Sequence, residues 1–270
     1  MFLRKTAAFI LVILITGCKN KNQNTDKIAL HSPIEADSTK QKEPTIPEDT
    51  EIWEPVPKKV NTTGNNNIPS DAIILFDGSA LGAWVSSKDT SKVADWIINN
   101  DSSMTVKNGA GDIQTKQEFG DIQLHIEWKN PATSEAIGQN RGNSGIFLQN
   151  RYEIQVLDTY ENKTYVNGQA AAVYKQHIPL VNASKPSGEW QTYDIIYRAP
   201  IFNETGSKTK DATVTVLHNG VLVQDHVSIK GTTEYIGWPK NTPHAKAALK
   251  LQDHMDHSGV SFRNIWVREL

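Results

Sequence analysis

The sequence has a single cysteine, no large excess of positive or negative charge, and few long apolar runs. Its one cysteine, Cys18, can form neither an internal disulfide nor a zinc site with several cysteine ligands. The 28 Lys and Arg residues nearly balance the 30 Asp and Glu residues, so the chain lacks the basic excess that binding to nucleic acid needs. The apolar run at 7–15 is too short to span a bilayer as a permanent helix.

The first residues have the pattern of a secretory signal. Arg4 and Lys5 precede the apolar run, and the letters ITGC follow at 15–18. This ending resembles a bacterial lipobox, which implies cleavage before Cys18 and lipid attachment to its sulfur. The alternative is an ordinary signal peptide with an incidental cysteine. We expect a protein that is lipid-anchored to a bacterial membrane, periplasmic or at the cell surface, and that contacts the membrane through this anchor only.

The remainder divides by composition into a linker and one domain. Residues 19–69 are rich in Lys, Asn, Thr, Pro and Glu and have few large apolar side chains, which predicts a disordered spacer. Residues 70–270 have the length of a single β-sandwich domain and are expected to hold the site.

The domain is predicted to be all-β, with two packed antiparallel sheets. Short segments rich in β-branched and aromatic residues alternate with period two and end at Gly, Asn, Asp or Pro. They lie at 72–76, 122–128, 145–149, 152–157, 191–197, 212–217, 221–227, 248–252 and 261–268. The Asn219-Gly220 pair predicts a two-residue hairpin turn.

One strand carries polar residues that need an explanation. On the segment RYEIQVLD at 151–158, alternation places Tyr152, Ile154 and Val156 on the core face and Arg151, Glu153 and Gln155 on the other face. That second face is either ordinary solvated surface or the floor of a polar groove.

A second cluster lies near the C-terminus. Asp253 precedes His254 and can hold it in one tautomer, as general-base chemistry requires. His254 and His257, with Asp253 and Asp256, can alternatively bind a divalent metal, although loop His-Asp pairs are common. No cofactor is certain from the sequence.

Two further segments supply candidate polar groups. Tyr174 and Lys175 lie in a long connection that is suited to cover a groove, where they can donate to a sugar or enolate oxygen. Asn143 and Ser144 come just before the strand at 145–149.

Five motifs in order give the domain a resemblance. They are LFDG at 75–78 with LGAW at 81–84, GNSGIFL at 142–148, YEIQVLD at 152–158, GEWQTYD at 188–194, and LQDH at 251–254 with FRNIWV at 262–267. Together they resemble the 3-keto-disaccharide hydrolase family over residues 70–270. The resemblance implies a concanavalin- or laminarinase-like jelly-roll sandwich, a Bacteroidetes lipoprotein, and glycosides or disaccharides oxidised at C3 as substrate.

Elimination chemistry assigns roles to the candidate residues. A C3 ketone acidifies the hydrogen at C2, so a base can remove it, the C1 oxygen leaves, and water can then add. We expect His254, oriented by Asp253, to be the base, and Glu153 to be the leaving-group acid or a metal or substrate ligand, although the two can exchange roles. Lys175 or Arg263 is expected to stabilise the enolate. The expected substrate-binding residues are Asn143, Ser144, Gln155, Tyr174 and Arg263.

Two alternatives remain open. A laminarinase-like retaining glycosidase needs two carboxylates about 5–5.5 Å apart, and Glu153 and Asp158 echo its motif, but Gln155 stands where a carboxylate belongs. A non-catalytic carbohydrate-binding lipoprotein would instead stack sugars on exposed aromatics, for which Trp84, Trp96, Trp128 and Trp238 are the candidates, although scattered tryptophans are more often part of a core.

Overall fold

The computed structural model describes residues 43–63 and 68–270. The chain divides into two units at Pro57 and Lys58. Within the first unit, residues 47–50 form a short 3₁₀ helix, η1 (Pro47–Thr50). Cys18 and the proposed signal lie outside the described residues. No helix in the described part of the chain is long and apolar enough to cross a membrane.

The second unit is built on two antiparallel sheets, of eight and five strands. The larger contains, in spatial order, β13 (Val221–Ile229), β12 (Ala212–His218), β9 (Gln191–Arg198), β6 (Ile122–Lys129), β15 (Ser261–Glu269), β4 (Met104–Thr105) and β3 (Ile97–Ile98), with β1 (Ile73–Phe76) paired to β15. The smaller contains β2 (Trp84–Ser86), β5 (Ile113–Phe119), β14 (Ala247–Leu251), β7 (Ser144–Leu148) and β8 (Tyr152–Val156). The predicted all-β jelly-roll sandwich is confirmed.

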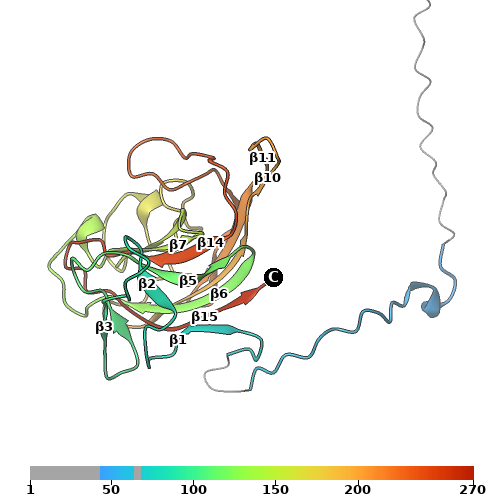
Figure 1. Ribbon diagram of the computed structural model, residues 1–270, viewed down its shortest axis with the longest axis horizontal. Helices are drawn as coiled ribbons and strands as arrows, with labels where there is room; N and C mark the ends of the chain where they lie inside the picture. Colours follow the sequence, from blue (N-terminus) through green and yellow to red (C-terminus); the bar gives the residue numbers. More distant parts are fainter. Residues whose placement is uncertain (1–42, 64–67) are drawn as a thin grey trace, which may run out of the picture. The chain divides into compact units, whose positions relative to one another are not determined.

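Short elements connect the sheets. Strands β10 (Ile201–Phe202) and β11 (Lys208–Lys210) form a separate hairpin, which lies at the upper right of the domain in Figure 1. Two further 3₁₀ helices lie in loops next to strands of the smaller sheet: η3 (Gly138–Asn140) precedes β7, and η4 (Val166–Gly168) follows β8. The predicted two-residue turn joins β12 to β13, where Asn219 and Gly220 have φ of 53° and 79°.

Alternation along the strands fills the space between the sheets. In β6 and β9 every second residue is buried, and apart from Gln191 these buried residues are apolar or aromatic. In Figure 1 strands β14 and β7 lie above β6 and β15, as two layers. From β9, Tyr193 donates a hydrogen bond of 2.8 Å to the carbonyl of Gln155 on β8. This bond crosses the core and ties β8, the strand that carries the predicted polar face, to β9 of the larger sheet.

Candidate active site

The outward face of β8 forms the floor of a buried polar cavity. Tyr152, Ile154 and Val156 belong to the core, as predicted, whereas Glu153 and Gln155 point away from it. Both are nonetheless buried, at 4% and 0% exposure. The interpretation as solvated surface is therefore wrong, and a polar groove is the correct alternative.

Two chain segments cover this face of the sheet. The backbone N–H of Tyr174 donates to the carbonyl of Glu153 at 3.1 Å, and the N–H of Glu153 donates to Oγ1 of Thr233 at 3.0 Å. A cavity of about 230 Å³ lies beneath them. It is lined by Asn143, Phe147, Glu153, Gln155, Tyr174, Thr233, Tyr235, Gln252 and His254. Residues from five separate stretches of the chain thus meet in one space.

Glu153 carries the carboxyl group that lines the cavity, and its pKa is strongly shifted. Burial raises the pKa of Glu153 to about 8, against a smaller lowering effect from Lys250 and Lys175 and a further raising effect from Asp112. Its side chain has no hydrogen-bond partner among the described residues, so nothing local compensates for the ionised form. At neutral pH this carboxyl group is mostly protonated and can donate a proton.

His254 lines the same cavity, but its partner is Asp256. Nδ1 of His254 lies 2.8 Å from Oδ2 of Asp256. The prediction that Asp253 orients His254 is wrong. Oδ2 of Asp253 accepts hydrogen bonds from the backbone N–H groups of Gly109 (2.8 Å) and Gly111 (3.0 Å), so it anchors a neighbouring loop instead.

Two amide oxygens in the cavity lack donors. Oε1 of Gln155 and Oε1 of Gln252 are buried and have no hydrogen-bond partner among the described residues. The Nε2 of Gln155 donates to Oδ1 of Asn143 at 3.0 Å, which fixes the orientation of the Gln155 amide. Because an unpaired buried oxygen is unfavourable, both oxygens are placed to accept hydrogen bonds from a ligand.

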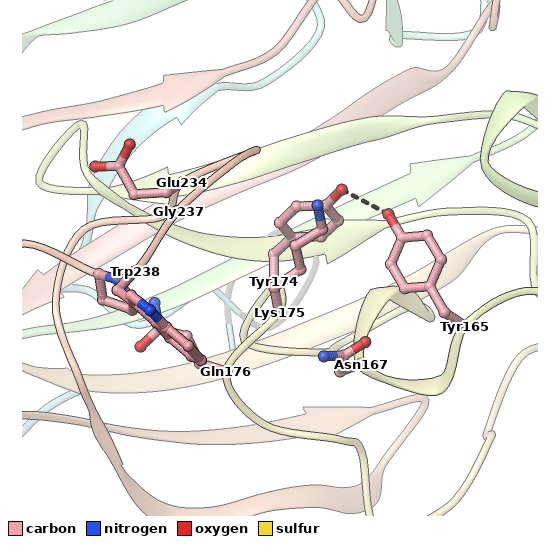
Figure 2. A pocket seen from close by; sticks show the side chains of 9 residues that line it. Tyr165, Asn167, Tyr174, Lys175, Gln176, Glu234, Gly237 and Trp238 are labelled. Carbon is pink, nitrogen blue, oxygen red and sulfur yellow. Dashed lines mark hydrogen bonds between the residues drawn. The ribbon is translucent and has the colours of Figure 1, made fainter.

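Tyr174 forms the rim of the cavity. Its hydroxyl lies 2.5 Å from the hydroxyl of Tyr165, a contact that Figure 2 shows as a dashed line. Burial and this hydrogen bond raise the pKa of Tyr174 well above its ordinary value, so the phenol stays protonated and donates its proton to Tyr165.

Three other predicted residues do not line this cavity. Nζ of Lys175 donates to the carbonyl of Tyr235 at 2.5 Å and lies in a neighbouring cavity. Ser144 is fully buried and donates to the carbonyl of Gln252 at 2.7 Å, which positions that residue. Arg263 belongs to the other sheet, where its Nε donates to Glu127 at 2.7 Å, and it does not line this cavity.

The described residues provide neither the group of ligands that the metal hypothesis needs nor the pair of carboxylates that the retaining-glycosidase hypothesis needs. Within residues 43–63 and 68–270, no three His, Cys, Asp or Glu side chains are grouped to hold a metal. Among the residues that line the cavity, Glu153 is the single carboxylate. Asp158 is instead paired to Nε of Arg141 at 2.9 Å. Retaining chemistry with two carboxylates is therefore not supported.

Several residues of the cavity were missed from the sequence. Phe147 and Gln252 lie in two of the family-like motifs but were given no role, and Thr233 and Tyr235 lie in no pattern that marks them as functional. The run EYIGWP at 234–239 carried one usable signal, since it places large apolar residues in a connection without strand alternation. Tyr235, Ile236 and Trp238 are in fact 75%, 83% and 89% exposed.

Comparison with known proteins identifies the family of the domain. A family model described as the 3-keto-alpha-glucoside-1,2-lyase-like domain matches residues 71–268. The chain belongs to this family. The family indicates a carbohydrate-active enzyme and a carbohydrate substrate. No curated protein gives a significant match.

Solved structures agree with the family assignment. A crystal structure of a "putative glycosyl hydrolase" from Parabacteroides distasonis is 51% identical, covers 83% of this chain and 97% of its own, and superposes with a TM-score of 0.80. A second structure with the same description and organism is 20% identical, covers 74% of this chain and 94% of its own, and has a TM-score of 0.53, which supports the fold alone.

Proposed function

We propose that this 3-keto-alpha-glucoside-1,2-lyase-like protein cleaves 3-keto-glycosides by removing the C2 proton and eliminating the C1 substituent. The observation that carries the proposal is that a protonated buried carboxyl, Glu153, and a carboxylate-oriented imidazole, His254, line one small cavity. An acid and a base with access to the same ligand are what an elimination needs.

His254 is the proposed base. Its Nδ1 is held by Asp256, so the tautomer with the proton on Nδ1 leaves Nε2 free to accept the C2 proton. The C2–H bond breaks, its electrons pass into the enolate of the C3 ketone, and they then form the C1=C2 bond. His254 is 34% exposed at its side chain, so solvent can take the proton between turnovers.

Glu153 is the proposed acid for the leaving group. As the C1–O bond breaks, the departing oxygen takes the proton of Glu153, and the products are a 2-hydroxy-3-ketoglucal and a free alcohol or sugar. Addition of water to C1=C2 would make the net reaction a hydrolysis. Proton donation of this kind typically contributes roughly 10²–10⁴-fold.

Tyr174 and two lysines are suited to stabilise the enolate. Tyr174 lines the cavity, and its hydroxyl, which remains protonated, would have to turn from Tyr165 to donate to the enolate oxygen. Lys250 and Lys175 lie outside the lining residues, yet both lower the pKa of Glu153, so their positive field reaches the cavity. The free oxygens of Gln155 and Gln252 are available to sugar hydroxyls.

Turnover of matched substrates tests the proposal. The wild-type protein should release the alcohol from a 3-keto-glucoside, with growth of enone absorbance, and should leave the same glucoside unoxidised at C3 intact. His254→Ala should abolish turnover, whereas His257→Asn, at the exposed histidine three residues along, should keep it. Cleavage of the unoxidised glucoside would contradict the proposal, and binding without product would support a carbohydrate-binding protein instead.

We also propose that the mature chain is attached to a bacterial membrane by lipid on Cys18. The support is the sequence alone, namely Arg4 and Lys5, the apolar run and the lipobox-like ending.

A further inference from the structure

The loop between β13 and β14 presents large apolar side chains to solvent. Tyr235, Ile236 and Trp238 are each at least 75% exposed, although side chains of these types are usually buried in whole or in large part. In Figure 1 the orange-red loop that leads into β14 lies at the upper edge of the domain. We call these three side chains the loop tip. Exposed apolar side chains that cluster in this way mark a binding surface.

The base of the loop is closed by short contacts. The N–H of Thr232 donates to the carbonyl of Lys240 at 2.9 Å, and the N–H of Lys240 donates to Oγ1 of Thr232 at 3.2 Å. A Cβ on Gly231 would lie 2.5 Å from that carbonyl oxygen, so this closure needs glycine. Nε2 of Gln176 also donates to the carbonyl of Gly231 at 2.9 Å, which ties the base to a second segment of the domain.

Lys175 holds the loop tip in place. Its Nζ donates to the carbonyl of Tyr235 at 2.5 Å and lies 4.5 Å from the centre of the Tyr235 ring. Figure 2 shows Trp238 on the opposite side of the neighbouring cavity from Tyr165 and Tyr174. The tip is therefore held in an exposed position and does not collapse onto the aromatic side chains nearest to it.

Positive charge surrounds the loop tip. The charged residues of the segment 230–240 are Lys230, Glu234 and Lys240, and Lys175 adds a third lysine. Glu234 is paired to Nζ of Lys240 at 3.4 Å. Lys175 and Lys230 form no ion pair among the described residues. Three lysines against one glutamate leave a net charge of +2 beside the tip.

We propose that the loop tip docks into the headgroup layer of an anionic lipid bilayer, in addition to the lipid anchor that the sequence predicts as the single membrane contact. Trp and Tyr have an apolar ring with one polar atom, which favours this layer of a membrane. Ile236 adds apolar area, and the lysines attract anionic headgroups. A protein partner suits the tip less well, because protein interfaces are depleted in lysine.

The contact would orient the domain and would not by itself retain it at the membrane. A few inserted side chains give weak and reversible binding, so retention in cells still depends on a second signal such as lipid on Cys18. A tethered domain stays close to the bilayer, where a weak contact is sufficient. The inference goes beyond the proposed elimination chemistry and does not depend on it.

Quenching of tryptophan fluorescence by brominated lipids tests the proposal. The full-length protein is mixed with an excess of vesicles of phosphatidylethanolamine and phosphatidylglycerol, so mass action forms the contact whether or not Cys18 carries lipid. Brominated acyl chains should quench the wild type, and Trp238→Phe should lose most of this quenching. The control Trp53→Phe, at a tryptophan that is 79% exposed in the other unit, should keep it. Absence of quenching in the wild type, or equal quenching in Trp238→Phe, would overturn the proposal.

A second variant separates membrane docking from a role in the cavities. Ile236→Asp should abolish the Trp238-dependent quenching, because a charge is unfavourable at the acyl boundary, and Ile52→Asp in the other unit should keep it. Ile236 lines neither cavity, so Ile236→Asp should also keep turnover of a soluble 3-keto-glucoside. Lost turnover with unchanged quenching would overturn the proposal.

Two further results are decisive. Equal quenching in vesicles of neutral phosphatidylcholine would overturn the preference for anionic lipid, and weaker quenching there would support it. If the wild type turns over no 3-keto-glucoside, the elimination chemistry fails, and Trp238-dependent quenching would still support the membrane contact.

Discussion

Glu153 is a carboxyl group placed on a sheet face that the chain then covers. Because side chains of a strand alternate between its two faces, the sequence predicted that Glu153 lies on the face opposite the core, together with Gln155. Burial could not be predicted, since it comes from segments around Tyr174 and Thr233 that carry no strand pattern. The pKa of Glu153 therefore follows from tertiary structure rather than from its motif.

Replacing Glu153 with Gln should separate its chemistry from its effect on stability. Its folded-state pKa of about 8 lies above the ordinary value of 4.5, so the folded protein binds the extra proton and loses stability as pH rises through this interval. Glu153→Gln should lower kcat by roughly 10²–10⁴-fold. At pH 8 it should also raise Tm above that of the wild type by about 3 °C or more, with little difference near pH 4. Thermal unfolding across pH measures this, and a variant less stable at pH 8 would contradict the assigned burial.

Asp256 and Asp253 should differ in what their removal damages. Asp256→Asn should lower kcat by roughly 10²–10⁴-fold with a small change in Tm, because it loses the partner of His254. Asp253→Asn should lower stability by about 1–3 kcal/mol and affect kcat less, because it frees the amides of Gly109 and Gly111. We would measure kcat and Tm for both variants. A large loss of kcat in Asp253→Asn together with a large loss of stability in Asp256→Asn would contradict the roles assigned to the two carboxylates.

Sequence adjacency misled the assignment of the histidine's partner. Asp253 and His254 are neighbours in the chain, but the strand β14 has ended at Leu251 and the chain bends there. Asp253 then points to the loop at 109–111, and Asp256 returns to the imidazole. Side-chain directions in such bends depend on left-handed residues such as Met255, with φ of 58°, which no periodic pattern predicts.

At the scale of elements, the hairpin of β7 and β8 sets the position of Glu153. Gly145 lies opposite Gln155, and a Cβ at Gly145 would lie 2.5 Å from Oε1 of Glu153 and 2.8 Å from the ring of Phe147. The motif GNSGIFL thus needs glycine at this position to leave room for the acid.

Gly145→Ala should therefore displace Glu153 and lower both activity and stability, the latter by about 1–3 kcal/mol through overpacking. Gly120→Ala is the matched control, since its Cβ would only reach 3.5 Å from flexible atoms of Lys246. Denaturant unfolding and turnover measure both effects. Equal behaviour of the two variants would show that the site has more room than the packing indicates.

Strands β6, β9 and β15 are joined on their outer side by a charged network. Burial opposes protonation of His125, but hydrogen bonds to Asp194 (2.7 Å) and interaction with Glu127 outweigh it and raise the pKa of His125 to about 9. Arg263 completes the network through Glu127. Arg263 thus supports the larger sheet, which explains why its motif is present without contact to the cavity.

The network predicts a stability change at alkaline pH. A histidine whose folded pKa exceeds its ordinary value of 6.5 contributes stability that is complete below 6.5 and is lost as pH rises through about 9. His125→Gln should therefore be less stable than the wild type at pH 6, and the difference in Tm should shrink by pH 10. A difference that stays constant across this range would contradict the charged state.

The strands themselves were largely predictable. All nine predicted segments are strands, because each is rich in β-branched and aromatic residues. Burial alternates strictly in β6 and β9, whereas β7 and β8 are buried on both faces. The missed strands are short or irregular: β3 has two residues, both exposed, and β5 has three consecutive exposed residues, Lys116 to Glu118, that break its alternation.

At the scale of the whole molecule, the sandwich brings together residues from 143 to 254 that are far apart in the chain. The sequence alone predicted the two sheets, and the family resemblance suggested that Glu153 and His254 share a site. The loop at 231–240 could not be predicted to close it, since its position depends on tertiary contacts such as Lys175 with Tyr235.

Membrane attachment is a prediction about the whole chain. In bacterial cells the wild-type protein should sediment with membranes, and Cys18→Ser should move it to the soluble fraction because the lipidated sulfur is lost. Immunoblots of both fractions measure this, and identical distribution of the two proteins would show that Cys18 carries no anchor.

Proton exchange at C2 tests the central claim most directly. A 3-keto-1,5-anhydroglucitol has the acidic C2 hydrogen but no leaving group, so deuterium uptake from D₂O, followed by NMR, reports the base alone. The wild type, Glu153→Gln and His257→Asn should all catalyse the exchange, and His254→Ala should reduce it to the uncatalysed rate. Exchange by His254→Ala at the wild-type rate would contradict His254 as the base.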